Sequence, residues 1–387
     1  MVEEIEKEFC EHVIPFWKGL RDQEYGGYYG LLTMDLELHK KAVKGCILNS
    51  RILWFFANVY ETFQDPTALS YAAHAAEFLK KYCVDREYGG VYWSVGYDGT
   101  PEDTTKHTYN QAFAIYALSA YYGVSKDEES LALAYDLFHR IESTCRDDQG
   151  YLEAFDRRWN PSGNDKLSEN GVEAKRTMNT LLHVMEAYTE LYRVDQSPKV
   201  KKILEEILSL IATKIYEPKK KRLGVFFDEN YHSLIDLHSY GHDIEAAWLL
   251  DRTTDLLKEE IWEQRMTPIA RTLEETIYQV AFDGHSVVAE CCEGEVNPLR
   301  IWWVQVESMV GFTNAYEKTK NPKYRQCVEA IWDYIKTYLI DPRPGSEWFS
   351  EVDAQGHPST GKPIVEPWKC PYHTGRMCFE LMKRNAF

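Results

Sequence analysis

The chain has 387 residues, of which 44% are hydrophobic and 14% aromatic, and its formal net charge is −17 at pH 7. This length exceeds one ordinary hydrophobic core, although a domain of repeated helical units can reach it. The negative charge excludes a binder of nucleic acid or of anionic membrane surfaces, because either would need a basic face, and it favours an uncharged small-molecule substrate.

The beginning of the sequence and its cysteines predict a cytoplasmic protein. The opening VEEIEKEF has neither the basic n-region nor the apolar h-region of a signal peptide, and the chain offers no apolar run of membrane-spanning length. The nine cysteines include no CxxC pair, so neither a disulfide framework nor a zinc ribbon is indicated. We therefore expect reduced thiols in a cytoplasm and no membrane partner.

Helical periodicity runs through the chain from its first residues, and no linker or low-complexity tract divides it. Helices are predicted to begin near residues 2, 45, 66, 107, 126, 175, 198, 242, 259, 302, 321 and 372. Between them, EYGGYYG from Glu24 and EYGGVYW from Glu87 are nearly the same phrase, with weaker copies from Gln149, Leu223 and Ser346. Small residues followed by alternating aromatic or β-branched positions predict short β-hairpins.

A repeat of about sixty residues means one helix pair per repeat, and the predicted helices make six pairs. Six pairs can close a ring with one helix of each pair inside and its mate outside. The apolar helices near residues 45, 107, 175, 242, 302 and 372 would form the inner set. We therefore expect an all-α fold, in which a single domain over residues 1–387 forms an (α/α)6 barrel of six helical hairpins with short β-hairpin loops.

The predicted inner helices carry polar side chains in their early turns. A buried helix should carry such residues only where function or a satisfied hydrogen bond requires them. The stretches HSYGHDIEAAW from His238 and PWKCPYHTGR from Pro367 each place a histidine near a helix start, after a Gly or Pro breaker. The candidates on these helices are Arg51, His107, Asn110, Asn179, His183, Glu186, His242, Glu245, Trp303, Glu307, His373 and Arg376. They should converge on one end of the barrel.

Two of these histidines, His242 and His373, suit proton transfer next to a carbonyl group. They come from distant parts of the chain, and a two-base site needs imidazoles on opposing walls. On a helix, His242, Glu245 and Trp248 share a face by three-residue steps. We therefore expect Glu245 to lie beside His242, where it would raise the basicity of the imidazole.

Other chemistries fit part of this pattern. A zinc site at His238, His242 and Glu245 lacks support from an HExxH motif, so we expect no metal. Glu245 and Glu307 could be the acid and base of an inverting glycosidase, although the histidines would then have no role. A non-catalytic glycan-binding protein would use the aromatic residues but gain nothing from the histidine pair. No GxGxxG, GxxxxGK[ST] or GxSxG motif supports nucleotide binding or serine hydrolase chemistry.

Several stretches carry a resemblance to a known family. They include KGCILNSRILWFF, KHTYNQAFAIYALS, TMNTLLHVMEAYTELY, HSYGHDIEAAWL, IWWVQVESMVGF and EPWKCPYHTGRMC. With them the chain resembles the cellobiose 2-epimerases, within the wider N-acylglucosamine 2-epimerase superfamily, over nearly its whole length. The resemblance implies an enzyme without external cofactor that reversibly converts the reducing-end glucose of β-1,4-linked disaccharides to mannose, taking cellobiose to 4-O-β-glucosyl-mannose and lactose to epilactose.

The resemblance also implies roles for individual residues. The implied catalytic residues are His242 and His373 as the acid/base pair, His183 as a further essential histidine, Arg51 at the enediolate oxygen, and Glu245 and Glu307 holding the imidazoles. Trp303 and Trp368 would stack on the two sugar rings. The other expected substrate-binding residues are Tyr109, His107, Asn110, Asn179, Trp248 and Arg376. An N-acylglucosamine 2-epimerase and an aldose–ketose isomerase on the same barrel are the alternatives, because the same site could act on an N-acetylated monosaccharide or return the proton to C1.

Overall fold

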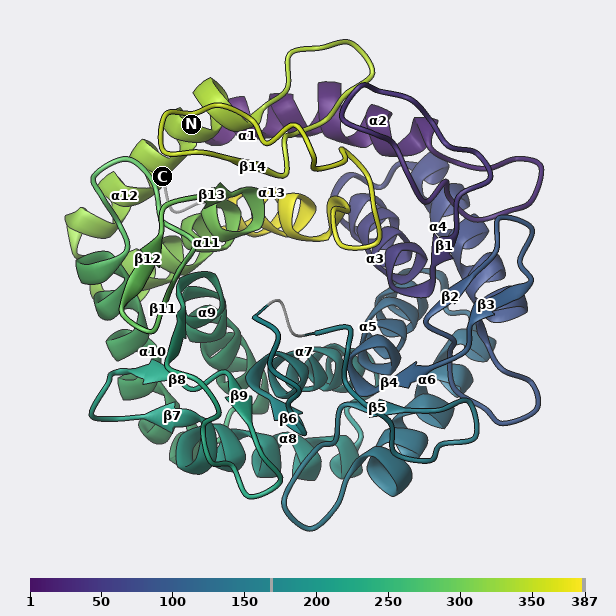
Figure 1. The fold of residues 1–387 in the computed structure, drawn as a ribbon, viewed down its shortest axis with the longest axis horizontal. Helices are drawn as coiled ribbons and strands as arrows, with labels where there is room; N and C mark the ends of the chain where they lie inside the picture. The colour runs from purple at the N-terminus through teal and green to yellow at the C-terminus, as the bar shows by residue number, and fades with distance from the viewer. Residues whose placement is uncertain (168–169, 385–387) are drawn as a thin grey trace.

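The computed structural model describes residues 1–167 and 170–384, and it shows two concentric rings of helices (Figure 1). The inner ring consists of α3 (Cys46–Phe63), α5 (Thr108–Ser125), α7 (Met178–Asp195), α9 (Tyr240–Leu257), α11 (Trp302–Thr319) and α13 (Pro371–Arg384). The outer ring consists of α1 (Val2–Glu8) and α2 (Ile14–Gly19), joined by a π-helical turn (Phe9–Val13), then α4 (Pro66–Phe78), α6 (Glu128–Arg140), α8 (Pro198–Leu210), α10 (Glu260–Val280) and α12 (Pro322–Tyr334). The inner ring closes where α13 packs against both α3 and α11.

The predicted (α/α)6 barrel is confirmed. Each predicted helix is present and begins within three residues of its predicted start, and the apolar set forms the inner ring. The largest difference is at α7, which begins at Met178 rather than near residue 175, because Arg176 and Thr177 are extended and form strand β6. Thr177 then caps the helix, since its side chain accepts a hydrogen bond from the backbone N–H of Thr180 at 3.0 Å.

Short antiparallel strands lead into the inner helices. β1 (Lys44–Gly45), β4 (Lys106–His107), β6 (Arg176–Thr177), β10 (Leu237–Ser239) and β13 (Arg300–Ile301) end directly before α3, α5, α7, α9 and α11. Their partners come from the following repeat and are β2 (Ser94–Val95), β5 (Ala154–Phe155), β9 (Phe226–Phe227), β11 (Glu290–Cys292) and β14 (Glu351–Val352). β3 (Pro101–Asp103) and β12 (Glu295–Asn297) extend two of these pairs, and β7 (Tyr216–Glu217) pairs with β8 (Arg222–Leu223). The pairs link neighbouring repeats and fix where the inner helices begin.

The predicted hairpins lie where the outer helices end. Bridges pair Arg21 with Tyr28, Val84 with Val91, Arg146 with Tyr151 and Ile340 with Trp348, while β7 pairs with β8. The sequence analysis missed a further copy of this hairpin, in which Phe282 bridges to Val287. Its DGHSVV segment lacks the aromatic residues that made the other copies recognisable.

Ion pairs with buried cations anchor the inner helices to these hairpins, a repeated feature that the sequence analysis did not recognise. In each pair an aspartate in the turn of a hairpin binds a cation in the strand before the inner helix of the same repeat. The pairs are Lys44 with Asp22, Lys106 with Asp85, Arg176 with Asp147 and Arg300 with Asp283. Because lysine is almost never fully buried unless it is paired, the buried lysines depend on these aspartates.

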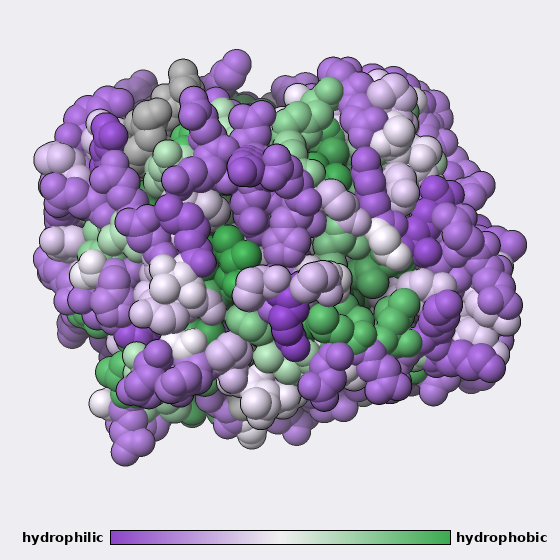
Figure 2. All heavy atoms as spheres, turned by 90° about the horizontal axis from the view of Figure 1, so that it is seen from above, coloured by the Kyte–Doolittle hydropathy of each residue, from purple (hydrophilic) through white to green (hydrophobic). Residues whose placement is uncertain are grey.

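Side chains of the inner helices are buried on nearly every face, whereas the outer helices bury one stripe. Small residues let the inner helices approach closely. A Cβ atom at Gly311 would lie 2.5 Å from Ile244, and one at Gly375 would lie 2.6 Å from Phe55. The outer wall seen in Figure 2 is mostly hydrophilic, with small hydrophobic patches between the polar side chains. No helix among the described residues is long and apolar enough to cross a membrane.

Candidate active site

His242 and His373 lie in the first turns of two inner helices, α9 and α13. The ring of Trp303, at the start of α11, contacts both imidazoles, with centroid separations of 4.8 Å to His242 and 5.4 Å to His373. This approach depends on Gly241, because a Cβ atom there would lie 2.5 Å from the Trp303 ring. The predicted histidines and one predicted aromatic platform therefore form a single cluster.

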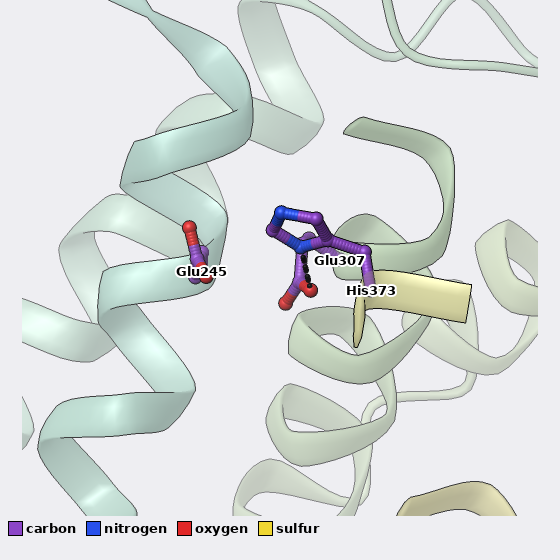
Figure 3. Close-up of side chains that lie close together, drawn as sticks. All are labelled: Glu245, Glu307 and His373. Carbon is purple, nitrogen blue, oxygen red and sulfur yellow. Dashed lines mark hydrogen bonds and ion pairs between the residues drawn. The ribbon is translucent and has the colours of Figure 1, made fainter. Parts of the chain in front are cut away.

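A buried carboxylate holds His373. Its Nδ1 lies 2.8 Å from Oε1 of Glu307, the hydrogen bond drawn in Figure 3. The same Oε1 accepts hydrogen bonds from Nε and Nη2 of Arg376, which can only donate, so it acts as an acceptor here. Nδ1 of His373 therefore carries the hydrogen, and the lone pair of the neutral ring lies on Nε2. Glu307 also accepts a hydrogen bond from Nε1 of Trp248 at 3.1 Å. The predicted role of Glu307 beside a histidine agrees with this placement.

A hydroxyl group, and not a carboxylate, holds His242. Its Nδ1 lies 2.7 Å from Oγ of Ser239, the residue directly before α9. The expectation that Glu245 would lie beside His242 is wrong, since Glu245 accepts its hydrogen bond from the guanidinium of Arg376. Residues three apart on a helix differ in direction by about 60°. Because of that difference, the Glu245 carboxylate points towards the guanidinium of Arg376 and not towards the imidazole of His242.

Arg376 lies beneath the histidines and joins three buried glutamates from three inner helices. Its guanidinium binds Glu186 of α7, Glu245 of α9 and Glu307 of α11. Arg376 is buried and its guanidinium is neutralised by these three carboxylates, so it supports the site from within the barrel and does not have the expected place in substrate binding. Its position three residues after His373 on α13 turns it towards the barrel interior, where the carboxylates lie.

Trp248 is also placed differently from its expected role. It is fully buried, its ring lies 4.9 Å from the Arg376 guanidinium, and its indole N–H binds Glu307. It therefore supports the ion-pair cluster from below and does not offer a face to a sugar.

His183 forms a second imidazole–carboxylate pair of the site, on α7. Its Nδ1 lies 2.8 Å from Oε2 of Glu186, which also accepts a hydrogen bond from the hydroxyl of Tyr372 at 2.5 Å. Burial alone would raise the pKa of Glu186, but Arg376 and His183 lower it overall, so the carboxylate is ionised. Tyr109 packs edge-on against His183 at 5.1 Å. The structure thus brings His183 and Tyr109 into the predicted site.

Arg51 is a buried cation without a carboxylate partner among the described residues. One of its amino groups donates to the hydroxyl of Tyr109 at 2.9 Å, and the other donates to Sγ of Cys370 at 3.7 Å. The guanidinium lies 4.1 Å from the centre of the Phe113 ring. Its Nε has no hydrogen-bond partner among the described residues. A buried, unneutralised cation of this kind favours an anion that forms close to it.

Aromatic rings gather beside Arg51. Trp368 is partly exposed and lies 5.9 Å from Tyr109 and 5.7 Å from Trp93. Trp93 also lies 5.0 Å from His107, whose pKa burial lowers to about 4, so this imidazole is neutral at pH 7. Neutral rings of this kind suit an uncharged sugar.

Three predicted polar residues near the starts of α5 and α7 have unused hydrogen-bonding atoms. Nδ1 of His107 and the side-chain oxygens of Asn110 and Asn179 are buried and have no partner among the described residues. The amide nitrogen of Asn110 donates to the carbonyl of Tyr92 at 2.7 Å, which fixes its side chain. These atoms are closed off from solvent in this structure, and the expected place of the three residues in substrate binding stays a prediction.

Comparison with known proteins gives the family. A sequence model of the N-acylglucosamine 2-epimerase (GlcNAc 2-epimerase) family matches residues 26–375. A cellobiose 2-epimerase of Ruminococcus albus is 49% identical over 386 residues, covering 100% of this chain and 99% of that protein, and one of Eubacterium cellulosolvens is 50% identical, covering 98% of each. The chain belongs to the N-acylglucosamine 2-epimerase family. A crystal structure of a sugar epimerase from a ruminal bacterium superposes with a TM-score of 0.98 at 48% identity, covering 99% of both chains. The predicted family is confirmed, and with it the prediction of a carbohydrate epimerase.

One cluster of the epimerase has the composition of a metal site. Ligand atoms of Glu245, Glu307 and His373, which face one another in Figure 3, lie within 4.8 Å of one another. The same Nη2 of Arg376 binds both carboxylates, so a cation already occupies the position between them. The zinc ligands considered from the sequence point to separate partners, since His238 binds Asp243 at 2.8 Å. The donor set therefore suits an arginine-centred ion-pair cluster better than a metal.

Three residues of the epimerase site were missed by sequence reasoning. Trp93 ends the EYGGVYW repeat, and its position after the hairpin was the available signal. Tyr372 directly precedes His373 and had no periodic signal of its own. Ser239 stands at the N-cap of α9, where a serine is read as a helix-capping residue, and nothing in the sequence indicates that it binds an imidazole.

Proposed function

We propose that the protein is a cellobiose 2-epimerase, which inverts C2 of the reducing-end glucose of β-1,4-linked disaccharides without an external cofactor. The observation that carries the proposal is the pair His242 and His373 around Trp303, each with Nδ1 held by a protein group. The relatives of 49% and 50% identity that carry this name over full length support it.

The chemistry of the reaction requires two bases and a stabilised anion. C2 of a closed pyranose is not acidic, but after ring opening it lies next to an aldehyde. A base can then remove its proton and leave an enediolate, whose charge needs a cation or hydrogen-bond donors. Arg51 supplies that cation from within the site. Inversion requires that the proton return to the opposite face of C2, which assigns one histidine to each face.

Both imidazoles are neutral at pH 7 in the free protein. Burial lowers the pKa of His242 to about 3, and burial together with the nearby Arg376 and Arg51 lowers the pKa of His373. One neutral imidazole accepts the C2 proton and later releases it to solvent. The enediolate, as an anion, favours protonation of the other imidazole, which takes a proton from water and delivers it to the opposite face. Hydrogen from solvent therefore enters the product at C2.

The geometry disfavours the glycosidase alternative. An inverting glycosidase needs carboxyl groups about 6.5–9.5 Å apart, with room for a water between them. Glu245 and Glu307 are fully buried, have oxygens within 4.8 Å of each other, and are joined by Arg376. A non-catalytic glycan-binding protein would gain nothing from carboxylate support behind a histidine.

The test is incubation of the purified protein with cellobiose in D₂O, without added cofactor and with N-acetylglucosamine in parallel, followed by NMR. We expect 4-O-β-glucosyl-mannose with deuterium at C2 of the mannose unit. Free glucose would indicate hydrolysis, and a ketose would indicate an aldose–ketose isomerase. A product from the N-acetyl sugar alone would indicate an N-acylglucosamine 2-epimerase, and no change in any sugar would contradict an epimerase of these substrates.

A further inference from the structure

The N-cap residue of α9 does not cap its helix. Serine and threonine at this position usually accept a hydrogen bond from a backbone N–H of the first turn. Thr177 does so at the same position before α7, where it binds the N–H of Thr180 at 3.0 Å. Ser239 makes no such bond, and its hydroxyl lies 2.7 Å from Nδ1 of His242 instead. The hydroxyl of Thr177 therefore caps its helix, whereas the hydroxyl of Ser239 at the equivalent position binds an imidazole.

The backbone around Ser239 holds this hydroxyl in place. Ser239 is the last residue of β10 and pairs in register with Glu290 of β11, and α9 begins at the next residue. The residue is 7% exposed, so water has little access to its side chain. His242 follows three residues later, within the first turn of the helix. The strand and the helix thus set the position of Oγ relative to the imidazole.

A hydroxyl supports an imidazole differently from a carboxylate. The Glu307 oxygen acts as an acceptor, so it keeps the hydrogen of His373 on Nδ1. The hydroxyl of Ser239 can rotate, donating to Nδ1 when that atom has the lone pair and accepting when it has the hydrogen. His242 can therefore hold its hydrogen on either ring nitrogen without losing its partner, while its ring stays against Trp303.

We propose that Ser239 is a positioning residue of the epimerase site, which orients the His242 ring with Nε2 towards the substrate and satisfies Nδ1 in both tautomers. The catalytic part of this inference rests on the proposed function. It gives Ser239 no contact with the sugar, so its loss changes turnover more than substrate binding.

The variants Ser239→Ala and Ser239→Thr test the proposal, with Thr177→Ala as the matched control. For cellobiose, Ser239→Ala should lower kcat by about 10–100-fold while KM changes less than about threefold, and Ser239→Thr should recover most of the loss. Thr177→Ala removes a true helix cap and should lower the melting temperature while leaving kcat within about twofold. Combining Ser239→Ala with His242→Asn should give no further loss beyond His242→Asn alone, because Ser239 acts through His242.

A readout without turnover separates this inference from the proposed function. In protein labelled with ¹⁵N at histidine, Ser239→Ala should shift the His242 ring nitrogens, and Thr177→Ala should not. Unchanged His242 signals would overturn the proposal, as would wild-type kcat in Ser239→Ala or equal losses in the alanine and threonine variants. If wild-type protein leaves the C2 hydrogen of cellobiose in place, the proposed function fails, and the ¹⁵N shifts still decide whether Ser239 positions His242.

Discussion

The two sides of the site support their histidines in different ways. His373 rests on Glu307, which in turn binds Arg376, so a buried network of charges stands behind one ring. His242 rests on the neutral hydroxyl of Ser239. The first arrangement fixes the position of the ring hydrogen and the second leaves it free. Two imidazoles with the same task therefore need not have the same hydrogen-bond partner. Both exchange the roles of acid and base during the reaction, and either kind of partner leaves Nε2 able to gain and lose a proton.

Loss of either imidazole should have the largest effect. The variants His242→Asn and His373→Asn keep an amide near the Nδ1 position but lack the group that reaches C2. We expect kcat for cellobiose epimerisation to fall by about 10⁴-fold, the upper end of general acid–base contributions, with disaccharide binding largely retained. Steady-state kinetics and calorimetric titration check this. Turnover near the wild-type rate in either variant would show that the histidine pair is not the catalytic pair.

Arg51 should act in the same way whichever histidine removes the proton. The enediolate is the same intermediate whichever histidine removes the proton, so its cation should matter in both directions. Arg51→Met should lower kcat by about 10²–10³-fold from glucosyl-glucose and from glucosyl-mannose alike. Because both directions pass through the same transition states, kcat/KM must fall by the same factor from each epimer, and steady-state kinetics give its size. Turnover within about twofold of the wild-type rate would contradict the assignment of Arg51 to the shared anion.

Replacing Glu307 changes the charged support of His373 and leaves the hydroxyl support of His242 in place. Glu307→Gln leaves an amide oxygen for Nδ1 of His373 but removes the charge facing Arg376. We expect a fall in kcat of about 10²-fold. Breaking a buried ion pair should also destabilise the fold by about 3 kcal/mol in chemical denaturation.

Glu245→Gln is the matched control for this change, because Glu245 binds the same guanidinium but not His373. Burial raises the pKa of Glu245 to about 7, so this side chain is partly neutral already and its replacement should cost less stability. Equal losses of kcat in both variants would mean that the ion-pair cluster, and not the hydrogen bond to His373, sets the rate.

The smallest expected effect is in the pH profile. Burial lowers the pKa of His242 to about 3, so its base form persists well below the ordinary value of about 6.5. We expect kcat/KM at pH 5 to stay within about twofold of its value at pH 7, whereas a histidine of ordinary pKa would lose about thirtyfold. An acid limb centred near pH 6.5 would contradict the lowered pKa of His242.

The same depressed pKa has an effect on stability that the pH experiment must control. Between about pH 6.5 and pH 3 the unfolded chain binds a proton at this histidine that the folded protein does not. The contribution of His242 to stability is therefore complete above pH 6.5 and is lost as the pH falls. Circular dichroism at each pH separates unfolding from loss of the base.

The sequence predicted the barrel well because long amphipathic and apolar helices have a strong periodic signal. The start of α7 was the least accurate, since the strand that precedes it depends on pairing with β9 from a distant part of the chain. The missed hairpin at Phe282 lacked the aromatic residues that identified its counterparts. The local sequence pattern thus predicted the helices and most hairpins, but not which strands pair with one another.

The residues of the site were predicted more completely than their contacts. Inner-helix position was enough to select His242, His373 and His183, because polar residues in buried first turns are unusual. The partner of Glu245 could not be predicted from helical spacing, since it is Arg376, which lies 131 residues away. The bond from Ser239 replaces an ordinary helix cap, and no sequence rule separates it from Thr177.

The most direct test of the two-histidine account is hydrogen exchange at C2 by each single variant. In D₂O, His242→Asn and His373→Asn are incubated separately with cellobiose and with 4-O-β-glucosyl-mannose, and loss of the C2 proton is followed by NMR. With one base for each face, each variant should exchange the C2 hydrogen of one epimer, the two variants should act on opposite epimers, and neither should interconvert them. Exchange of the same epimer by both variants would contradict the assignment of one histidine to each face.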